Sequence, residues 1–175
     1  MNTQIINLLG APGAGKSTLA AGLFYKMKQN YMSVELVTEY AKDLHYDGHA
    51  SHELDQLSVF AEQHRRIDRL LGKVEYVISD SPLFLSAYYA NKNSYSHTFA
   101  NYVLEIAESH NNINYLVKRS HRYDPNGRSQ DEAGSDLIYD EMYWFMKLRN
   151  IQFELIHAGD TTPAFIYNSL FQVSL

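Results

Sequence analysis

The sequence predicts a three-layer α/β fold, in which a five-stranded parallel sheet carries helices on both faces. Five short apolar segments alternate with longer segments of helical periodicity, which is typical of parallel sheets with right-handed crossovers. The first apolar segment runs directly into a glycine-rich loop. The 175 residues contain no repeat, linker or low-complexity tract, so we expect one domain over residues 1–175.

The strands are predicted where apolar runs end in glycine or polar residues. Near-continuous apolar runs indicate strands that are buried on both faces of a parallel sheet. Asp80, Ser81 and Pro82 stop the third strand. The predicted strands cover residues 4–10, 33–38, 74–79, 113–118 and 151–157.

The helices are predicted from apolar residues that recur on one helical face. After the loop, Leu19, Leu23 and Met27 recur at a spacing of four. A polar break follows the second strand and its helical stretch, and Ser51 is expected to cap the next helix. The predicted face of that helix consists of Leu57, Phe60, His64, Ile67 and Leu71. The predicted helices cover residues 16–29, a stretch after residue 38, and residues 53–73, 95–110, 131–149 and 161–171.

The glycine-rich loop has the pattern G-x-x-x-x-G-K-[ST], met by Gly10, Gly15, Lys16 and Ser17. Its strand-loop-helix context predicts phosphate binding by backbone N–H groups and a helix N-terminus, and argues against a turn that binds nothing. Lys16 is expected to reach the β- and γ-phosphates of ATP, and the Ser17 hydroxyl to bind Mg²⁺. The predicted ATP-binding residues are Gly10, Ala11, Pro12, Gly13, Ala14, Gly15, Lys16, Ser17 and Thr18.

Two carboxylates follow strands at the edge where the phosphates should lie. Asp80 ends the third strand, where an acidic residue commonly orients Mg²⁺; its alternative role is that of a turn residue. Glu39 follows the second strand, where it can accept the proton of an acceptor hydroxyl. The alternative for Glu39 is a first-turn glutamate that the helix dipole favours.

A basic, turn-rich segment over residues 118–130 is predicted to form an arginine-rich lid. It contains Arg119, Arg122 and Arg128, and is broken by Pro125 and Gly127. Such a lid would exclude water and bring guanidinium groups to the charge that develops on a transferred phosphoryl group. A solvated basic loop is the alternative.

The helix before the third strand carries the candidates for the acceptor side. Arg65, Arg69 and Lys73 recur at four-residue intervals, and this basic stripe could contact phosphates or be a solvated face. Gln63 and His64 could meet an acceptor base, although a histidine on an apolar stripe is more often a core residue. Tyr40, next to Glu39, is also assigned to the acceptor side.

Composition limits the classes of function. A net charge of -5 argues mildly against non-specific nucleic-acid binding. The absence of cysteine excludes disulfides and thiolate zinc sites, and the histidines lack the H-E-x-x-H spacing of a zinc site. With no signal peptide or apolar run of membrane-spanning length in view, we expect a soluble cytoplasmic protein without a membrane partner. The oligomeric state stays open, a homodimer included.

Four segments in order carry a resemblance to known proteins: INLLGAPGAGKSTLAAGLFYKMK, VELVTEYAKDL, YVISDSPL and YDPNGRSQ. The chain resembles small P-loop kinases of the thymidylate-kinase-like group that tailed phages encode, in particular the 5-hydroxymethyl-deoxyuridine DNA kinases. The resemblance implies a P-loop kinase fold, ATP at residues 10–18, a lid at residues 119–128 and a location in the host cytoplasm. It also implies phosphorylation of the hydroxymethyl group of 5-hydroxymethyluracil in DNA, a step toward hypermodified thymidine.

The sequence leaves other acceptors and classes open. Asp80, Ser81 and Pro82 stand where thymidylate kinases usually carry an Asp-Arg pair, which puts recognition of a monophosphate there in doubt. Related phage kinases act on free nucleosides or nucleotides with the same motifs. A non-kinase P-loop NTPase or switch would be favoured by an N-K-x-D run, which the sequence lacks. A DNA-binding module with a vestigial loop is disfavoured by the complete Gly-Lys-Ser core and the acidic charge.

Overall fold

The computed structural model describes residues 2–49, 55–92, 96–124 and 131–171. Its sheet has five parallel strands in the order β2-β3-β1-β4-β5, so the predicted fold class is confirmed. The strands are β1 Gln4–Leu9, β2 Val34–Val37, β3 Tyr76–Ser79, β4 Asn111–Lys118 and β5 Glu154–His157. The strand order changes direction at β1, which lies between β3 and β4, and ligands of such sheets bind beyond the carboxyl ends of the strands at this point.

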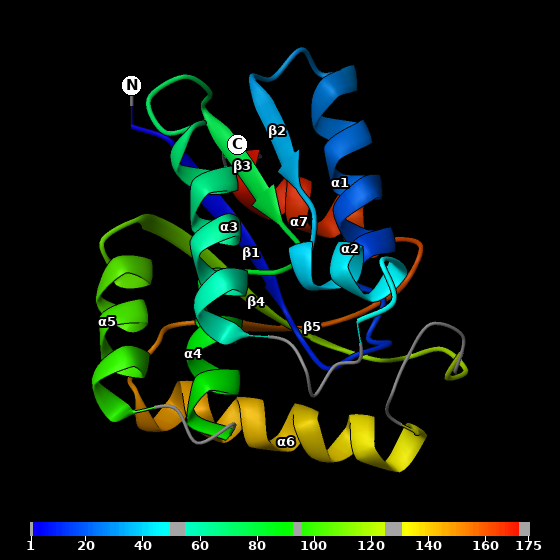
Figure 1. Ribbon diagram of the computed structural model, residues 1–175. Helices are drawn as coiled ribbons and strands as arrows, with labels where there is room; N and C mark the ends of the chain where they lie inside the picture. The colour runs from blue at the N-terminus through cyan, green and yellow to red at the C-terminus, as the bar shows by residue number, and fades with distance from the viewer. Residues whose placement is uncertain (1, 50–54, 93–95, 125–130, 172–175) are drawn as a thin grey trace.

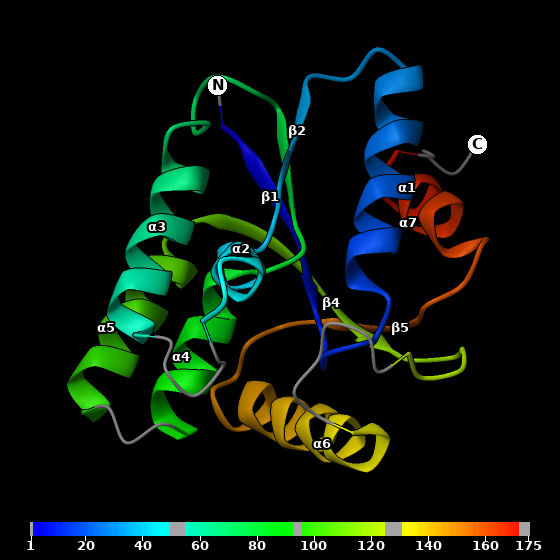
Figure 2. The same cartoon turned by 45° about the vertical axis from the view of Figure 1, so that its right-hand side comes forward.

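Helices cover both faces of the sheet (Figures 1 and 2). Within the described ranges they are α1 Lys16–Gln29, α2 Tyr40–Tyr46, α3 Gln56–Asp68, α4 Leu83–Lys92, α5 His97–Glu108, α6 Glu132–Leu148 and α7 Thr162–Phe171. Helices α1 and α7 lie on one face, and α3, α4 and α5 lie on the other. Helix α6 crosses below the carboxyl ends of the strands in both views.

The side chains of β1 alternate between two buried clusters, as the period of a strand requires. Ile5 and Leu9 belong to the cluster under α3 to α6, while Ile6 and Leu8 belong to the cluster under α1 and α7. Asn7 is the polar exception, and its buried amide donates hydrogen bonds to the Oδ1 atoms of Asn112 and Asn114 at 2.8 Å each. The central strand is therefore buried on both faces with its polar side chain satisfied.

Helix α4 was not predicted, and its burial explains why. Its sequence, LFLSAYYANK, follows Pro82, and its residues Leu83 to Tyr88 are all buried. A helix that is enclosed on several sides has no polar face, so the periodicity that marks an amphipathic helix is missing. The apolar run after the third strand is this helix.

Helix α3 is shorter than predicted, and the face that it turns inward overlaps the predicted face only in part. It begins at Gln56, and its cap is Asp55, whose carboxylate accepts hydrogen bonds from the N–H groups of Leu57 and Ser58. The predicted cap, Ser51, lies outside the described residues. Leu57 is exposed, whereas Val59, Phe60, Gln63 and Ile67 are buried together with Gln56. The helix ends at Asp68, five residues before the predicted end.

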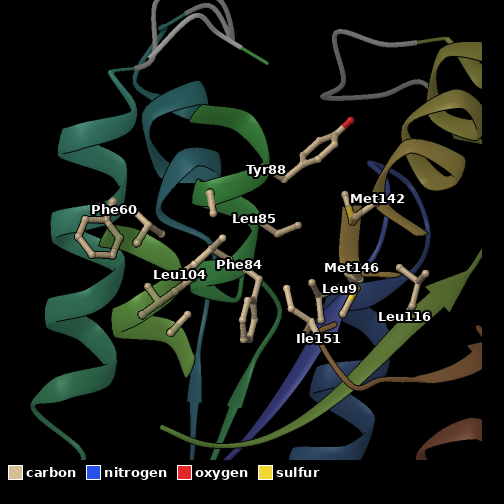
Figure 3. Close-up of a cluster of buried hydrophobic side chains, with 14 of the residues drawn as sticks. Leu9, Phe60, Phe84, Leu85, Tyr88, Leu104, Leu116, Met142, Met146 and Ile151 are labelled. Atoms are coloured by element: carbon tan, nitrogen blue, oxygen red, sulfur yellow. The ribbon is translucent and has the colours of Figure 1, made fainter. Parts of the chain in front are cut away.

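Helix α6 packs against the sheet through two methionines. Met142 and Met146 are fully buried beside Leu9, Leu116 and Ile151, as Figure 3 shows. The unbranched methionine side chain fills the gap between the helix and the strand ends. This packing holds α6 beside the loop that follows β1.

We expect Met142→Ala to lower the free energy of unfolding by about 2–4 kcal/mol, because truncation leaves a cavity in a packed core. Leu148→Ala is the matched control, since Leu148 belongs to the same helix but is 78% exposed. Urea unfolding of both variants checks this. Equal losses of stability would show that α6 is not held by its methionine face.

Candidate active site

Glycines shape the loop between β1 and α1. Gly10, Gly13 and Gly15 have φ angles of 154°, 80° and 92°, which L side chains rarely adopt. A Cβ on Gly10 would lie 2.8 Å from the carbonyl oxygen of Val117 on the neighbouring strand β4. A Cβ on Gly15 would lie 3.0 Å from the Ala158 Cβ. The loop therefore closes tightly against the ends of its neighbours, and glycine is required at these positions.

The loop presents positive charge to a ligand. The Lys16 ammonium group donates hydrogen bonds to the carbonyl oxygens of Gly10 (2.9 Å) and Ala11 (3.2 Å), so it lies over the loop. Gly15 caps α1 without any side-chain hydrogen bond, and the first turn of this helix contains no acidic residue. The N–H groups at this helix end are thus suited to an anion such as a phosphate. From α6, the Ser135 hydroxyl donates to the carbonyl oxygen of Pro12 (2.7 Å) and anchors the loop.

Asp80 follows β3 at the same edge of the sheet. Its side chain is 3% exposed, and its Oδ1 atom has no hydrogen-bond partner within the described residues. A buried carboxylate oxygen without a partner is costly unless a cation or water meets it. Asp80 and the exposed Ser17 hydroxyl fit Mg²⁺, which binds through one or two protein oxygens and the phosphates of its nucleotide. The described ranges hold no group of three or more acidic or histidine side chains that would form a protein-only metal site.

Glu39 ends the loop after β2 and is the N-cap of α2. Burial raises the pKa of its carboxyl group above the ordinary value of 4.5. The nearby Lys16 ammonium lowers this pKa in part, and Asp80 raises it further. The structure thus brings Lys16, Glu39 and Asp80 together, as predicted from their positions after three strands. Their catalytic roles stay predictions.

Tyr89 of α4 borders the same group, and sequence reasoning missed it. Burial raises the pKa of its phenol, and the charges of Glu39 and Glu141 raise it further. The neighbouring Tyr88 donates a hydrogen bond to Glu141, which also pairs with Lys92 at 2.7 Å. In the sequence, the only feature that could have pointed to Tyr89 was the pair Tyr88-Tyr89. It lies in a segment without the periodicity of an amphipathic helix.

The structure shows the partners of Arg119. Its guanidinium group pairs with Glu132 and Asp136 of α6, at 2.5 Å each, and lies 5.5 Å from the ring centre of Tyr123. Its predicted role toward the phosphates stays a prediction. Arg122 is exposed, and Arg128 lies outside the described residues. The lid itself stays a prediction.

A pocket of about 320 Å³ lies between the loop and α6. Its lining includes Ala11, Ala14, Lys118, Arg119, Ser135 and Asp136. Loop, strand end and helix therefore enclose one space beside the predicted phosphate site.

The prediction that Arg69 and Lys73 face the acceptor is wrong. They follow the last turn of α3, which runs antiparallel to the strands (Figure 1). The Thr3 hydroxyl accepts from the N–H of Gly72 (2.9 Å) and donates to the carbonyl of Val74 (2.6 Å). This ties the turn to the start of β1, at the opposite end of the sheet from the loop.

The other candidates on α3 have partners within the protein. Arg65 is exposed and pairs with Glu62 at 2.7 Å. His64 stacks on Phe60, with ring centres 5.7 Å apart, and on His110, with ring centres 6.2 Å apart. The half-buried His64 ring therefore packs between Phe60 and the segment that follows α5, and its predicted contact with an acceptor base stays a prediction.

Gln63 and Tyr40 are linked to each other. The buried Gln63 accepts a hydrogen bond from the backbone N–H of Tyr40. Arg66, which was not predicted as a site residue, lies 5.0 Å from the ring centre of Tyr40. These residues contact the backbone next to Glu39, and the predicted role of Gln63 and Tyr40 toward the acceptor stays a prediction.

The family model of the AAA domain matches residues 5–161. The chain belongs to this family. The matched range of the AAA domain includes the loop, Glu39, Asp80 and β4. No curated protein matches the sequence.

Solved structures resemble this AAA domain over nearly its whole length. A thymidylate kinase from Ehrlichia chaffeensis has a TM-score of 0.63 and 15% identity, with 99% of this chain and 100% of that chain covered. A deoxyadenosine kinase from M. mycoides, solved with the products dCMP and dCDP, has a TM-score of 0.54 and 17% identity, with 97% and 100% covered. The AAA domain therefore has the P-loop fold of these kinases.

None of the helices in the described ranges has the length and hydropathy that a membrane span requires.

We expect Gly10→Ala to abolish nucleotide binding, because the added Cβ would collide with the Val117 carbonyl and displace the loop. Gly72→Ala is the control, since Gly72 also has a positive φ, of 74°, but has no atom within 4 Å of an added Cβ and lies at the other end of the sheet. A titration with a fluorescent ATP analogue compares the two. Nucleotide affinity that Gly10→Ala leaves intact would remove the loop from the binding site.

Proposed function

We propose that this AAA domain is an ATP-dependent kinase that transfers the γ-phosphate to a hydroxyl group of a nucleoside-type acceptor. The observation that carries the proposal is the group formed by Lys16, Glu39 and Asp80 beside the phosphate-binding loop. It combines a cation for phosphates, a carboxylate for Mg²⁺ and a second carboxylate for the acceptor. The kinase fold of the two structural relatives supports the same reaction class.

The loop would hold the triphosphate of ATP through its backbone N–H groups, the α1 N-terminus and Lys16. Ser17 and Asp80 would hold Mg²⁺, which when bound neutralises charge on the β- and γ-phosphates. The low exposure of Asp80 strengthens these electrostatic interactions, because water screens them less. The chain thus supplies positioning and charge, on which phosphoryl transfer mainly depends.

Glu39 would act on the acceptor hydroxyl. The hydroxyl oxygen forms a bond to the γ-phosphorus, the bond from that phosphorus to the β-γ bridging oxygen breaks, and ADP leaves. The hydroxyl proton passes to the Glu39 carboxylate. A raised pKa makes this carboxylate a better proton acceptor than an ordinary glutamate, provided that the pH keeps it ionised.

The charges near Glu39 favour a neutral acceptor over a phosphate. Arg66 is paired with Asp43 (2.7 Å) and Glu62 (3.0 Å), and Arg119 is paired with two carboxylates of α6. Both guanidinium charges are thus balanced by carboxylates, although the Nε atom of Arg119 has no hydrogen-bond partner within the described residues. A phosphate dianion beside Glu39, Asp80 and Asp43 would meet repulsion that Lys16 and Lys42 offset in part, whereas a neutral hydroxyl would meet none. The names of the two structural relatives differ on this point, since one is a deoxyadenosine kinase and the other a thymidylate kinase.

Two acceptors that carry a neutral hydroxyl group are a free nucleoside and 5-hydroxymethyluracil in DNA. The DNA acceptor rests on the resemblance of the sequence to phage DNA kinases. However, Arg69 and Lys73, two of the cations proposed for the DNA backbone, lie at the far end of the sheet. The geometry therefore supports the hydroxyl acceptor and gives no separate support to DNA.

Label transfer from [γ-³²P]ATP tests the acceptor class. The acceptors offered are free nucleosides, nucleoside monophosphates, plain DNA and DNA that contains 5-hydroxymethyluracil. We expect label on nucleoside or hydroxymethyl groups and none on monophosphates. Label on monophosphates would overturn the hydroxyl acceptor, and release only as inorganic phosphate would favour an NTPase or switch.

We expect Glu39→Gln to lower kcat by about 10²-fold or more with ATP affinity retained, in the range usual for loss of a general base. Because burial raises the pKa of Glu39, its ionised form is lost as the pH falls through a value above 4.5. The acid limb of kcat/KM should therefore lie above 4.5 in the wild type and disappear in Glu39→Gln. Glu35→Gln, which changes a more exposed glutamate on β2, is the control. Wild-type turnover by Glu39→Gln would assign the proton to another group.

A further inference from the structure

The buried amide of Gln63 binds the backbone on both sides of Glu39. Its Oε1 accepts a hydrogen bond from the N–H of Tyr40 (3.1 Å), and its Nε2 donates one to the carbonyl oxygen of Thr38 (3.3 Å). Gln63 is 1% exposed, so bulk water does not compete for its amide. Both hydrogen bonds therefore restrain the peptide groups that flank Glu39.

Arg66, three residues further along α3, makes a second contact with the same segment. Its Nη1 donates to the Thr38 carbonyl (3.4 Å), and its Nη2 binds the Asp43 carboxylate (2.7 Å). Its guanidinium group also lies 5.0 Å from the ring centre of Tyr40, within the range of a cation-π interaction. Arg66 thus connects α3 to the residue before Glu39 and to the first turn of α2.

Among the described residues, few other contacts hold helix α2. It contains seven residues, none of them buried, and Glu39 caps it without a side-chain hydrogen bond. A helix of this length is not stable alone, so its position depends on contacts with other elements. The described contacts from Gln63 and Arg66 act at the start of this helix, where Glu39 lies.

We propose that Gln63 and Arg66 form a clamp that positions Glu39 for proton transfer. The inference rests on the proposed function, and it assigns Gln63 to the backbone of the site rather than to the acceptor base. The clamp touches no reacting atom. It acts by keeping the Glu39 carboxylate at one distance and angle from the acceptor hydroxyl, on which the rate depends steeply.

Two variants test the clamp against a matched control. Gln63→Met removes both hydrogen bonds while keeping an unbranched buried side chain, and Arg66→Met removes the second contact. We expect kcat to fall about 10- to 100-fold in each, with acceptor KM and ATP affinity unchanged. Arg149→Met is the control, because Arg149 is an exposed arginine at the end of α6 and hydrogen-bonds Asn101 (3.0 Å) rather than any residue of α2. It should behave as the wild type.

A double-mutant cycle shows whether the effect passes through Glu39. In a Glu39→Gln background, Gln63→Met should cause no further loss of kcat, because the group that it positions is already gone. A raised acceptor KM with unchanged kcat would instead place Gln63 in contact with the acceptor and overturn the clamp. Additive losses of kcat in the double-mutant cycle would also overturn the clamp, because they would show that Gln63 acts independently of Glu39.

Hydrogen exchange separates the clamp from the proposed reaction. The Tyr40 amide should exchange faster in Gln63→Met than in the wild type, since its acceptor is removed. Unchanged exchange at Tyr40 would overturn the clamp whatever the activity. If Glu39→Gln turns over normally while Tyr40 exchange rises as expected, the clamp stands as a structural contact and the proposed base fails.

Discussion

The positive charge of Lys16 permits two carboxyl groups to lie together in a poorly hydrated part of the protein. Burial raises the cost of ionising the Glu39 carboxyl group, and the negative charge of Asp80 adds to that cost. The Lys16 ammonium, held over the loop by the carbonyls of Gly10 and Ala11, offsets it in part. The site depends on this balance, because a kinase of the proposed type needs both carboxylates ionised and close to the same phosphate.

The parallel sheet explains why these three residues could be predicted from the sequence. Each follows a strand, and the carboxyl ends of parallel strands meet at one edge. A residue's place after a strand therefore fixes its place in the site without knowledge of side-chain packing. The same reasoning gave the fold class, since the alternation of apolar runs and helical periods depends only on local sequence.

The residues that sequence reasoning misplaced depend on contacts between distant segments. Arg69 and Lys73 kept the spacing of a helix, but α3 ends at Asp68 and points their segment away from the loop. Arg119 lines the pocket beside the loop, but its two carboxylate partners on α6 could not be predicted from the sequence. The sequence does not distinguish Arg66 from Arg65. Its proposed role in the clamp comes from contacts with Thr38 and Asp43, which lie more than 20 residues earlier in the chain. No local pattern encodes such partners.

The pKa of the Glu39 carboxyl group, measured by ¹³C NMR titration in the wild type and in Lys16→Met, tests the central claim most directly. Burial should place it above the ordinary value of 4.5 in the wild type. Removal of the lysine charge should raise it further, because the ionised form then loses its nearest compensation. A value at or below 4.5 that Lys16→Met leaves unchanged would show that the two groups do not interact, and would contradict the proposed site.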